Sequence, residues 1–137
     1  DGARKGQAVL SGVGLVGRVI EAGNHTSRVL LVTDINSRVP IIVEDSRQHA
    51  IMAGDNGAQP VLMHMPPDSQ IASGARIITS GQGGIFPQGL PVGRVVIDEN
   101  GSYRVELFSD FDRLIHVRII DRPDDPNLQE GSPRALD

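Results

Sequence analysis

An internal repeat constrains the fold of this chain more than any other feature of its sequence. Residues 17–34 and 93–110 align without a gap at a spacing of 76 residues. Gly17-Arg18-Val19-Ile20 matches Gly93-Arg94-Val95-Val96, and both segments continue into a run that ends in aspartate. Because self-similarity at a fixed spacing marks a unit that is used twice, the sequence predicts two related structural units in tandem.

Each copy is predicted to be a set of strands joined by tight turns. A β-branched run ends at Ser11-Gly12 in the first copy and at Ser80-Gly81 in the second, and a strand then begins at the shared Gly-Arg-Val. The next reversal is predicted at the structural turn residues Gly23 and Asn24, and in the second copy at Asn100 and Gly101. Such turns need residues that accept a positive φ.

Composition favours strands over helices. The chain holds 14 Val and 13 Ile against 10 Leu, together with 16 Gly and 9 Pro, and β-branched residues and turn formers are typical of pleated structure. Further strands are predicted at residues 40–44, 61–65 and 115–120, and a short helix only at residues 46–52. The sequence therefore predicts an all-β fold of two small related β-barrels in tandem, with little helix.

The expected domain boundaries follow from the repeat and from a change of composition near residue 120. Residues 6–45 are expected to form the first β-barrel, completed by strands from elsewhere in the chain or from upstream of it. Residues 46–120 are expected to form the second β-barrel. Residues 121–137 carry three prolines, many charges and little to bury, so we expect a flexible, disordered tail there.

Charge and cysteine content exclude several functional classes. With 13 Lys and Arg against 17 Asp and Glu the formal net charge is −4, which argues against a nucleic-acid partner. The absence of cysteine excludes thiol nucleophiles, disulfides and cysteine-ligated zinc. The four histidines lack ligand spacing, so neither a metal nor a cofactor is expected. No run approaches the roughly 20 apolar residues that span a bilayer.

Two glycine-rich motifs suggest enzymes, and the sequence argues against both. Residues 12–17 match the dinucleotide-binding pattern GxGxxG, but that mechanism needs a helix where β-branched residues follow. The alternative function is a chymotrypsin-like double-barrel serine hydrolase with Ser80 as nucleophile. Because Ser80 has a counterpart in Ser11, a hydroxyl that bonds nearby backbone in a turn is the simpler interpretation, and no catalytic residue is expected. The presence of only four aromatic residues disfavours a sugar-binding barrel.

The least ordinary segment is the loop at residues 83–93, where apolar residues stand between glycines and prolines. It contains Phe86, one of only three phenylalanines. Either the loop tucks Phe86 into its own barrel, or it displays an apolar surface to a partner; tucking is favoured because an exposed Phe is costly in a soluble monomer. Ile85, Phe86 and Leu90 are the candidate partner-binding residues of this loop.

The same segment carries a family resemblance. The run that begins at Thr79 and continues through Gly84-Ile85-Phe86-Pro87-Gln88-Gly89-Leu90-Pro91-Val92-Gly93-Arg94-Val95 resembles the signature of the bacterial rod shape-determining protein family MreC. Residues 14–19, followed by residues 26–34 and 37–40, resemble an earlier part of the same family pattern. The similarity covers about residues 6–120 in the family's order, and the acidic, proline-rich tail departs from it.

The resemblance implies a non-enzymatic scaffold of the complex that elongates the cell wall and governs rod cell shape. Family members place two β-barrels in the periplasm or outside the membrane and self-associate into homo-oligomers. They bind an elongation-specific penicillin-binding transpeptidase, MreD and, across the membrane, MreB. By this resemblance we expect a periplasmic location, with the full-length protein anchored in the inner membrane by a segment that this sequence does not include.

Overall fold

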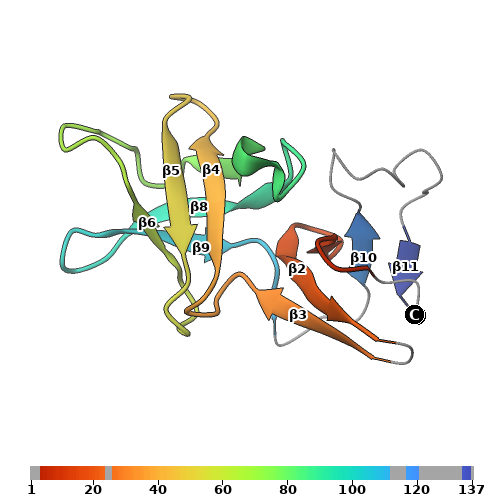
Figure 1. Ribbon diagram of the computed structural model, residues 1–137. Helices are drawn as coiled ribbons and strands as arrows, with labels where there is room; N and C mark the ends of the chain where they lie inside the picture. The colour runs from red at the N-terminus through yellow and green to blue at the C-terminus, as the bar shows by residue number, and fades with distance from the viewer. Residues whose placement is uncertain (1–3, 24–25, 112–116, 121–133, 137) are drawn as a thin grey trace.

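The computed structural model describes residues 4–23, 26–111, 117–120 and 134–136, and these residues form an almost entirely β structure (Figure 1). Within these ranges the only helical element is a short 3₁₀ turn, η1, at Gln82–Gly84. Nothing in the described part of the chain is a helix of the length and apolarity that crossing a membrane requires. The predicted all-β fold is confirmed.

The larger unit is a closed six-stranded barrel, on the left of Figure 1. Its strands follow one another around the barrel in the order β4 (Arg38–Val43), β5 (His49–Ala53), β6 (Val61–Met63), β9 (Tyr103–Leu107), β8 (Pro91–Ile97) and β7 (Arg76–Thr79). Alternate residues such as Val39, Ile41 and Val43 point inward and are buried, as the period of a strand requires. Closure pairs every barrel strand on both sides and so leaves no exposed edge.

The smaller unit is a five-stranded sheet built from both ends of the chain. Its strand order is β11 (Arg134–Leu136), β10 (Val117–Ile120), β1 (Ala8–Leu10), β2 (Leu15–Ala22) and β3 (Ser27–Leu31). The pairing is antiparallel throughout, and Ala8 lies opposite Ile120. The barrel is therefore inserted into the chain between two strands of this sheet, β3 and β10.

The internal repeat appears as two hairpins with the same strand register. The matching pairs are Gly17 with Leu31 and Val19 with Val29 in β2–β3, and Gly93 with Leu107 and Val95 with Val105 in β8–β9. Each residue of the second set stands 76 positions after its counterpart in the first. The first hairpin departs from the second only beyond Val19, where a bulge shifts the register.

One hydrophobic core joins the two units. The part of the chain before the barrel contributes four buried residues to the same cluster as the barrel strands, namely Ala8, Leu10, Leu15 and Val32. A buried polar contact reinforces this junction: Ser109 Oγ lies 2.7 Å from Ser11 Oγ and donates to the Gly14 carbonyl at 3.0 Å. The sheet and the barrel therefore share a packed interior. A second, separate cluster of buried residues lies in the sheet and consists of Val9, Val16, Val19 and Ile119.

The observed strand pairing differs from the expected division of the chain. A boundary after residue 45 would place β4 in the first unit, but β4 pairs with β5 and β7 and belongs to the barrel. Likewise β10 pairs with β1 rather than with a barrel strand, and the first unit is an open five-stranded sheet over the described residues. The expected boundaries differ because contacts between segments far apart in the sequence determine which strands β4 and β10 pair with.

Two shorter segments also differ from expectation. Residues 49–53 form strand β5 where a short helix is expected, because hydrogen bonding to β4 on one side and β6 on the other favours the extended backbone. Residues 134–136 of the expected tail form β11, which pairs with β10. Residues 121–133 and 137, the rest of that tail, lie outside the described residues.

Candidate functional site

The loop between β7 and β8 holds the three candidate partner-binding residues. Phe86 is only 3% exposed and packs in the barrel core, so the loop tucks this side chain inward rather than displaying it. Ile85 and Leu90 are half-buried and pack against the same core. The buried Phe86 side chain therefore attaches the loop to the barrel core. Of the three candidate residues, only Ile85 and Leu90 retain surface that a partner can reach.

Thr79, the last residue of β7, fixes the shape of this loop. Its buried hydroxyl donates to the carbonyl of Pro87 at 2.6 Å and accepts the amide of Leu90 at 2.8 Å. The Thr79 backbone adds two more bonds, from its amide to the Leu90 carbonyl and from the Gly89 amide to its carbonyl. These four hydrogen bonds tie the second half of the loop to the end of β7.

Ser80 is a turn-forming residue. Its hydroxyl accepts the amide of Gln82 at 3.2 Å, and in the first copy Ser11 accepts the amide of Val13 at the same distance. The interpretation of Ser80 as a turn hydroxyl is confirmed. Within the part of the chain that the structure describes, no imidazole hydrogen-bonds to Ser80, whose hydroxyl bonds to backbone instead; His25 and His116 lie outside that part.

Three of the four expected turn residues lie at the two hairpin ends. Gly101 has a positive φ of 81°, and the Asn100 amide donates to Asp98 Oδ1 at 2.9 Å. In the first hairpin the Gly23 amide donates to the Thr26 carbonyl at 2.7 Å. Asn24 lies outside the described residues.

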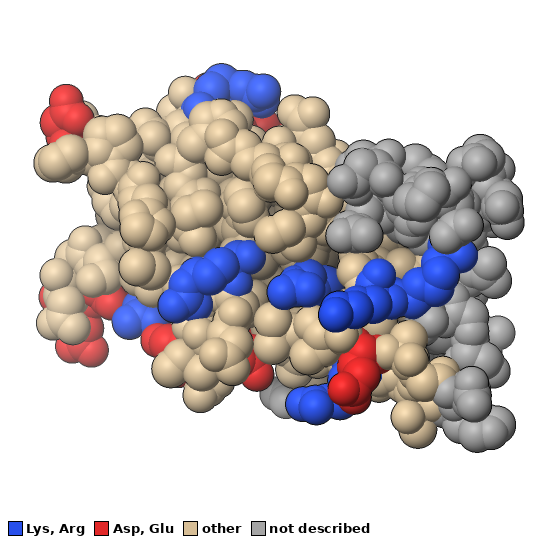
Figure 2. All heavy atoms as spheres, in the orientation of Figure 1, with Lys and Arg blue, Asp and Glu red and all other residues tan. Residues whose placement is uncertain are grey.

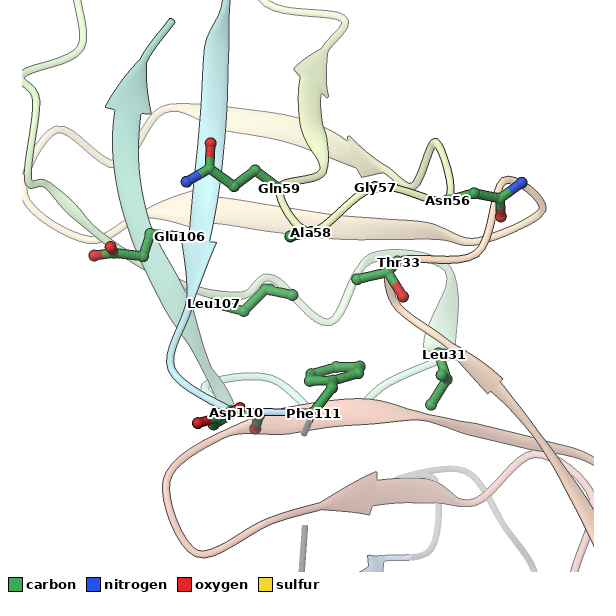
Figure 3. Close-up of a pocket in the computed structure, with 11 residues that line it drawn as sticks. Leu31, Thr33, Asn56, Gly57, Ala58, Gln59, Glu106, Leu107, Asp110 and Phe111 are labelled. Atoms are coloured by element: carbon green, nitrogen blue, oxygen red, sulfur yellow. The ribbon is translucent and has the colours of Figure 1, made fainter. Parts of the chain in front are cut away.

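A groove of about 450 Å³ opens where the barrel meets the sheet (Figure 3). Leu31, Leu107 and the ring of Phe111 surround its opening, and the first two occupy equivalent positions of the repeat. Glu106 and Asp110 place exposed carboxylates on one side. The groove therefore combines apolar side chains with acidic ones.

Arg104 fixes the loop that forms another wall of this groove. Its guanidinium donates to Asp55 Oδ2 at 2.7 Å, to Asp98 Oδ2 at 3.2 Å and to the carbonyl of Gln59 at 3.0 Å. Residues 56–59 line the groove, so these bonds tie its wall to the β8–β9 hairpin. The arrangement positions the groove without placing Arg104 in it.

These contacts shift the pKa values of the three charged groups. The hydrogen bond from Arg104 is the main cause that lowers the pKa of Asp55. For Asp98 the Ser102 amide lowers the pKa most, and Arg104 adds to the effect. The pKa of Arg104 is raised, chiefly by its bond to Asp55. All three shifts favour the charged forms, which are the forms that hold the loop.

The sequence points to the loop at residues 83–93 and misses the groove. The groove residues come from the ends of β3 and β9 and from the segments that follow β3, β5 and β9, and no single motif brings those segments together. The one available signal is the repeat, which makes Leu31 and Leu107 equivalent on sequence grounds alone. Within the described residues no cluster of three or more His, Asp or Glu side chains is placed to hold a metal ion.

Comparison with known proteins gives one consistent family. Residues 1–121 match the model of the rod shape-determining protein MreC, barrel core. The chain is 42% identical over 120 residues to the cell shape-determining protein MreC of Cereibacter sphaeroides. That alignment covers 88% of this chain and 40% of the relative, so the chain spans less than half the length of the relative it matches.

Two solved structures have the same arrangement of strands. MreC from Pseudomonas aeruginosa superimposes with a TM-score of 0.78 at 32% identity, over 88% of this chain and 81% of that one. A complex between a penicillin-binding protein (PBP2) and MreC from Helicobacter pylori gives a TM-score of 0.67 at 20% identity, over 85% and 78% of the two chains. At that identity the second likeness shows the fold alone.

Proposed function

Because the chain belongs to the MreC family of rod shape-determining proteins, we propose that it is a non-enzymatic scaffold of the machinery that elongates the cell wall. The match of the barrel core over residues 1–121 is the observation that carries this proposal. The Ser80 hydroxyl accepts the amide of Gln82 in a turn, which agrees with a structural role for this residue. The chain's role is then to hold other proteins in place.

The proposed principal partner is an elongation-specific penicillin-binding transpeptidase. The Helicobacter pylori relative is known in complex with a penicillin-binding protein, which supports the same kind of partner here. We further propose self-association, MreD and MreB as the remaining contacts, a periplasmic location and a membrane anchor in the full-length protein. Each of these follows from the family and not from a site in the described residues.

Ile85 and Leu90 are the proposed transpeptidase contacts. Both are half-buried on a loop that Thr79 holds rigid, so little conformational entropy is lost when a partner binds. Phe86 supports them from the core and is not itself a contact. The two aliphatic side chains give a partner apolar surface to bury.

The test is capture of the purified transpeptidase by the full-length protein carrying Leu90→Asp. We expect a loss of capture of about tenfold or more, because a charge would be placed in an apolar contact. Gln88→Asp is the matched control, because Gln88 is exposed on the same loop and is expected to leave capture unchanged. Failure of the unmodified protein to capture the transpeptidase would contradict the scaffold proposal; equal capture by the folded Leu90→Asp variant would contradict the choice of loop.

A further inference from the structure

The chain contains two Asn-Gly pairs, Asn56-Gly57 and Asn100-Gly101. In such a pair the backbone nitrogen of the glycine lies next to the side-chain carbonyl carbon of the asparagine, and no Cβ atom on the glycine hinders its approach. Attack of that nitrogen closes a five-membered ring within the chain, so an Asn-Gly pair is prone to lose its side-chain amide group. An acidic residue directly precedes each pair, so the local sequence hardly distinguishes the two.

The side chain of Asn56 is held by a neighbouring segment. Its Oδ1 atom accepts the amide of Ile35 at 2.9 Å, and its backbone amide donates to the carbonyl of Thr33 at 2.7 Å. The Gly57 amide donates to Asp55 Oδ1 at 2.9 Å, and a Cβ atom added at Gly57 would lie 3.0 Å from the same oxygen. Ring closure at Asn56 therefore requires its side chain to leave a hydrogen bond and to move in a crowded space.

The side chain of Asn100 has no such restraint. It is exposed, and among the described residues its side-chain amide takes part in no hydrogen bond. A Cβ atom added at Gly101 would meet nothing within 4 Å, so the space around the attacking residue is open. The turn that contains Asn100 projects from the left-hand end of the barrel in Figure 1, and Figure 2 shows Asp and Glu side chains on the surface at that end. Water can therefore reach a ring that forms there.

Asp98 organises the turn that contains Asn100. Its Oδ1 atom accepts the amides of Asn100 and Ser102, both at 2.9 Å, and its backbone carbonyl accepts the amide of Gly101 at 2.9 Å. Its other carboxylate oxygen, Oδ2, accepts from Arg104 at 3.2 Å. Because Arg104 also bonds to the segment that lines the groove, one side chain joins the turn to the groove wall.

We propose that Asn100 is a site of spontaneous modification that alters the wall of the groove. The Gly101 nitrogen forms a bond to Asn100 Cγ, the bond from Cγ to Nδ2 breaks, and the Gly101 amide proton leaves with the amino group as ammonia. Water then opens the succinimide ring. Cleavage between the Gly101 nitrogen and Cγ gives aspartate, and cleavage between that nitrogen and the backbone carbonyl carbon of residue 100 gives isoaspartate. The overall reaction consumes one water and releases one ammonia, and it does not depend on the proposed function.

Isoaspartate changes the turn more than aspartate does, because it adds one methylene group to the backbone between residues 100 and 101. The amides of Gly101 and Ser102 then no longer match the Asp98 oxygens that accept them. Both products also add a negative charge close to Asp98 and Glu99. We therefore expect the contact between Asp98 and Arg104 to weaken in the isoaspartate form, and the groove wall at residues 56–59 to loosen with it.

The test is incubation of the full-length protein at neutral pH for several weeks, followed by proteolysis and mass spectrometry. Conversion raises the mass of a peptide by about 1 Da, and fragmentation distinguishes isoaspartate from aspartate. We expect conversion at Asn100 to be about tenfold faster than at Asn56, or more. Absence of conversion at Asn100, or equal conversion at the two sites, would overturn the proposal.

The unfolded chain is the matched control, because the two pairs have similar flanking residues. In guanidinium chloride the hydrogen bonds of Asn56 are lost, and both asparagines should convert at similar rates. A tenfold difference that persists in the unfolded chain would show that the fold does not cause it, which contradicts the structural argument.

Hydrogen exchange measured on the peptide that contains residues 55–59 tests the link to the groove. Exchange there should become several-fold faster in the converted protein. The Asn100→Gln variant kept under the same conditions should retain its original exchange, because glutamine must close a less favourable six-membered ring. Unchanged exchange in the fully converted protein would overturn the effect on the groove wall.

Discussion

At the scale of single residues, Arg104 joins segments that lie far apart in the sequence. It binds Asp55 and Gln59, which border the groove, and Asp98 in the β8–β9 turn. Asp55 and Arg104 are only partly covered, with side chains 41% and 28% exposed. The Asp55 pair therefore contributes less than about 1 kcal/mol at neutral pH, and its main effect is on the position of the loop.

Acid should release this loop. Because the pKa of Asp55 lies below its ordinary value of 3.8 in the folded protein, its contribution to stability is present above that pH and is lost as pH falls through the lowered folded pKa. We expect the melting temperature of the unmodified chain to fall more steeply below about pH 4 than that of Arg104→Gln, in which Asp55 loses the main cause of its shift.

Thermal unfolding followed by circular dichroism at a series of pH values measures this difference. Arg28→Gln serves as the control, because the Arg28 to Glu21 contact is 4.0 Å long between side chains 72% and 68% exposed. Parallel pH curves for the unmodified chain and Arg104→Gln would show that the contact does not stabilise the fold.

At the scale of elements, the two hairpins depend on a close approach of backbones. A Cβ atom added to Gly17 would lie 2.2 Å from the Leu30 carbonyl oxygen, and one added to Gly93 would lie 2.2 Å from that of Glu106. The same clash recurs at equivalent positions of the repeat. The glycine of the shared Gly-Arg-Val motif is therefore needed for close packing of the two strands and not for a ligand site.

Alanine at either glycine should destabilise the chain. We expect Gly17→Ala and Gly93→Ala each to lower the free energy of unfolding by about 1 to 3 kcal/mol, because a backbone carbonyl cannot move aside as a flexible side chain can. Denaturant titration at constant m measures the change. At Gly12 an added Cβ meets nothing within 4 Å, so Gly12→Ala should stay close to the unmodified chain. Equal stability of all three variants would refute the argument.

The hairpins also show how far the sequence predicts the fold. Local patterns predict both hairpins and the turn hydroxyl of Ser80, since turn chemistry and a period of two act over a few residues. The partners of β4 and β10 cannot be predicted in this way, because they depend on which distant strands close the barrel and the sheet. The expectation of a helix in place of β5 is wrong for the same reason: the extended form of this segment comes from neighbours on both sides.

The candidate sites also differ in whether local sequence or contacts between distant segments form them. The loop that holds Ile85 and Leu90 is one continuous motif, so its sequence alone marks it. The groove cannot be found in this way, because its lining residues come from three stretches that are far apart in the sequence.

At the scale of the whole molecule, the sheet and the barrel should unfold together. They share one buried cluster, and Ser109 bridges them through Ser11 and the Gly14 carbonyl. We expect a single thermal transition, with the calorimetric enthalpy equal to the van't Hoff enthalpy. Two separate transitions would contradict a common core. Ser109→Ala should lower the melting temperature by a few degrees without splitting the transition, because a buried hydroxyl contact is worth about 1 kcal/mol.

The insertion of the barrel between β3 and β10 sets an order of events during synthesis. Strands β1 to β3 are synthesised before the barrel strands, yet β1 has no neighbour on its second side until residues 117–120 have been added. The barrel needs nothing beyond residue 107 to close. The sheet is therefore begun before the barrel and completed after it. A chain that ends between residues 107 and 117 contains every strand of the barrel but lacks the strand that pairs with β1.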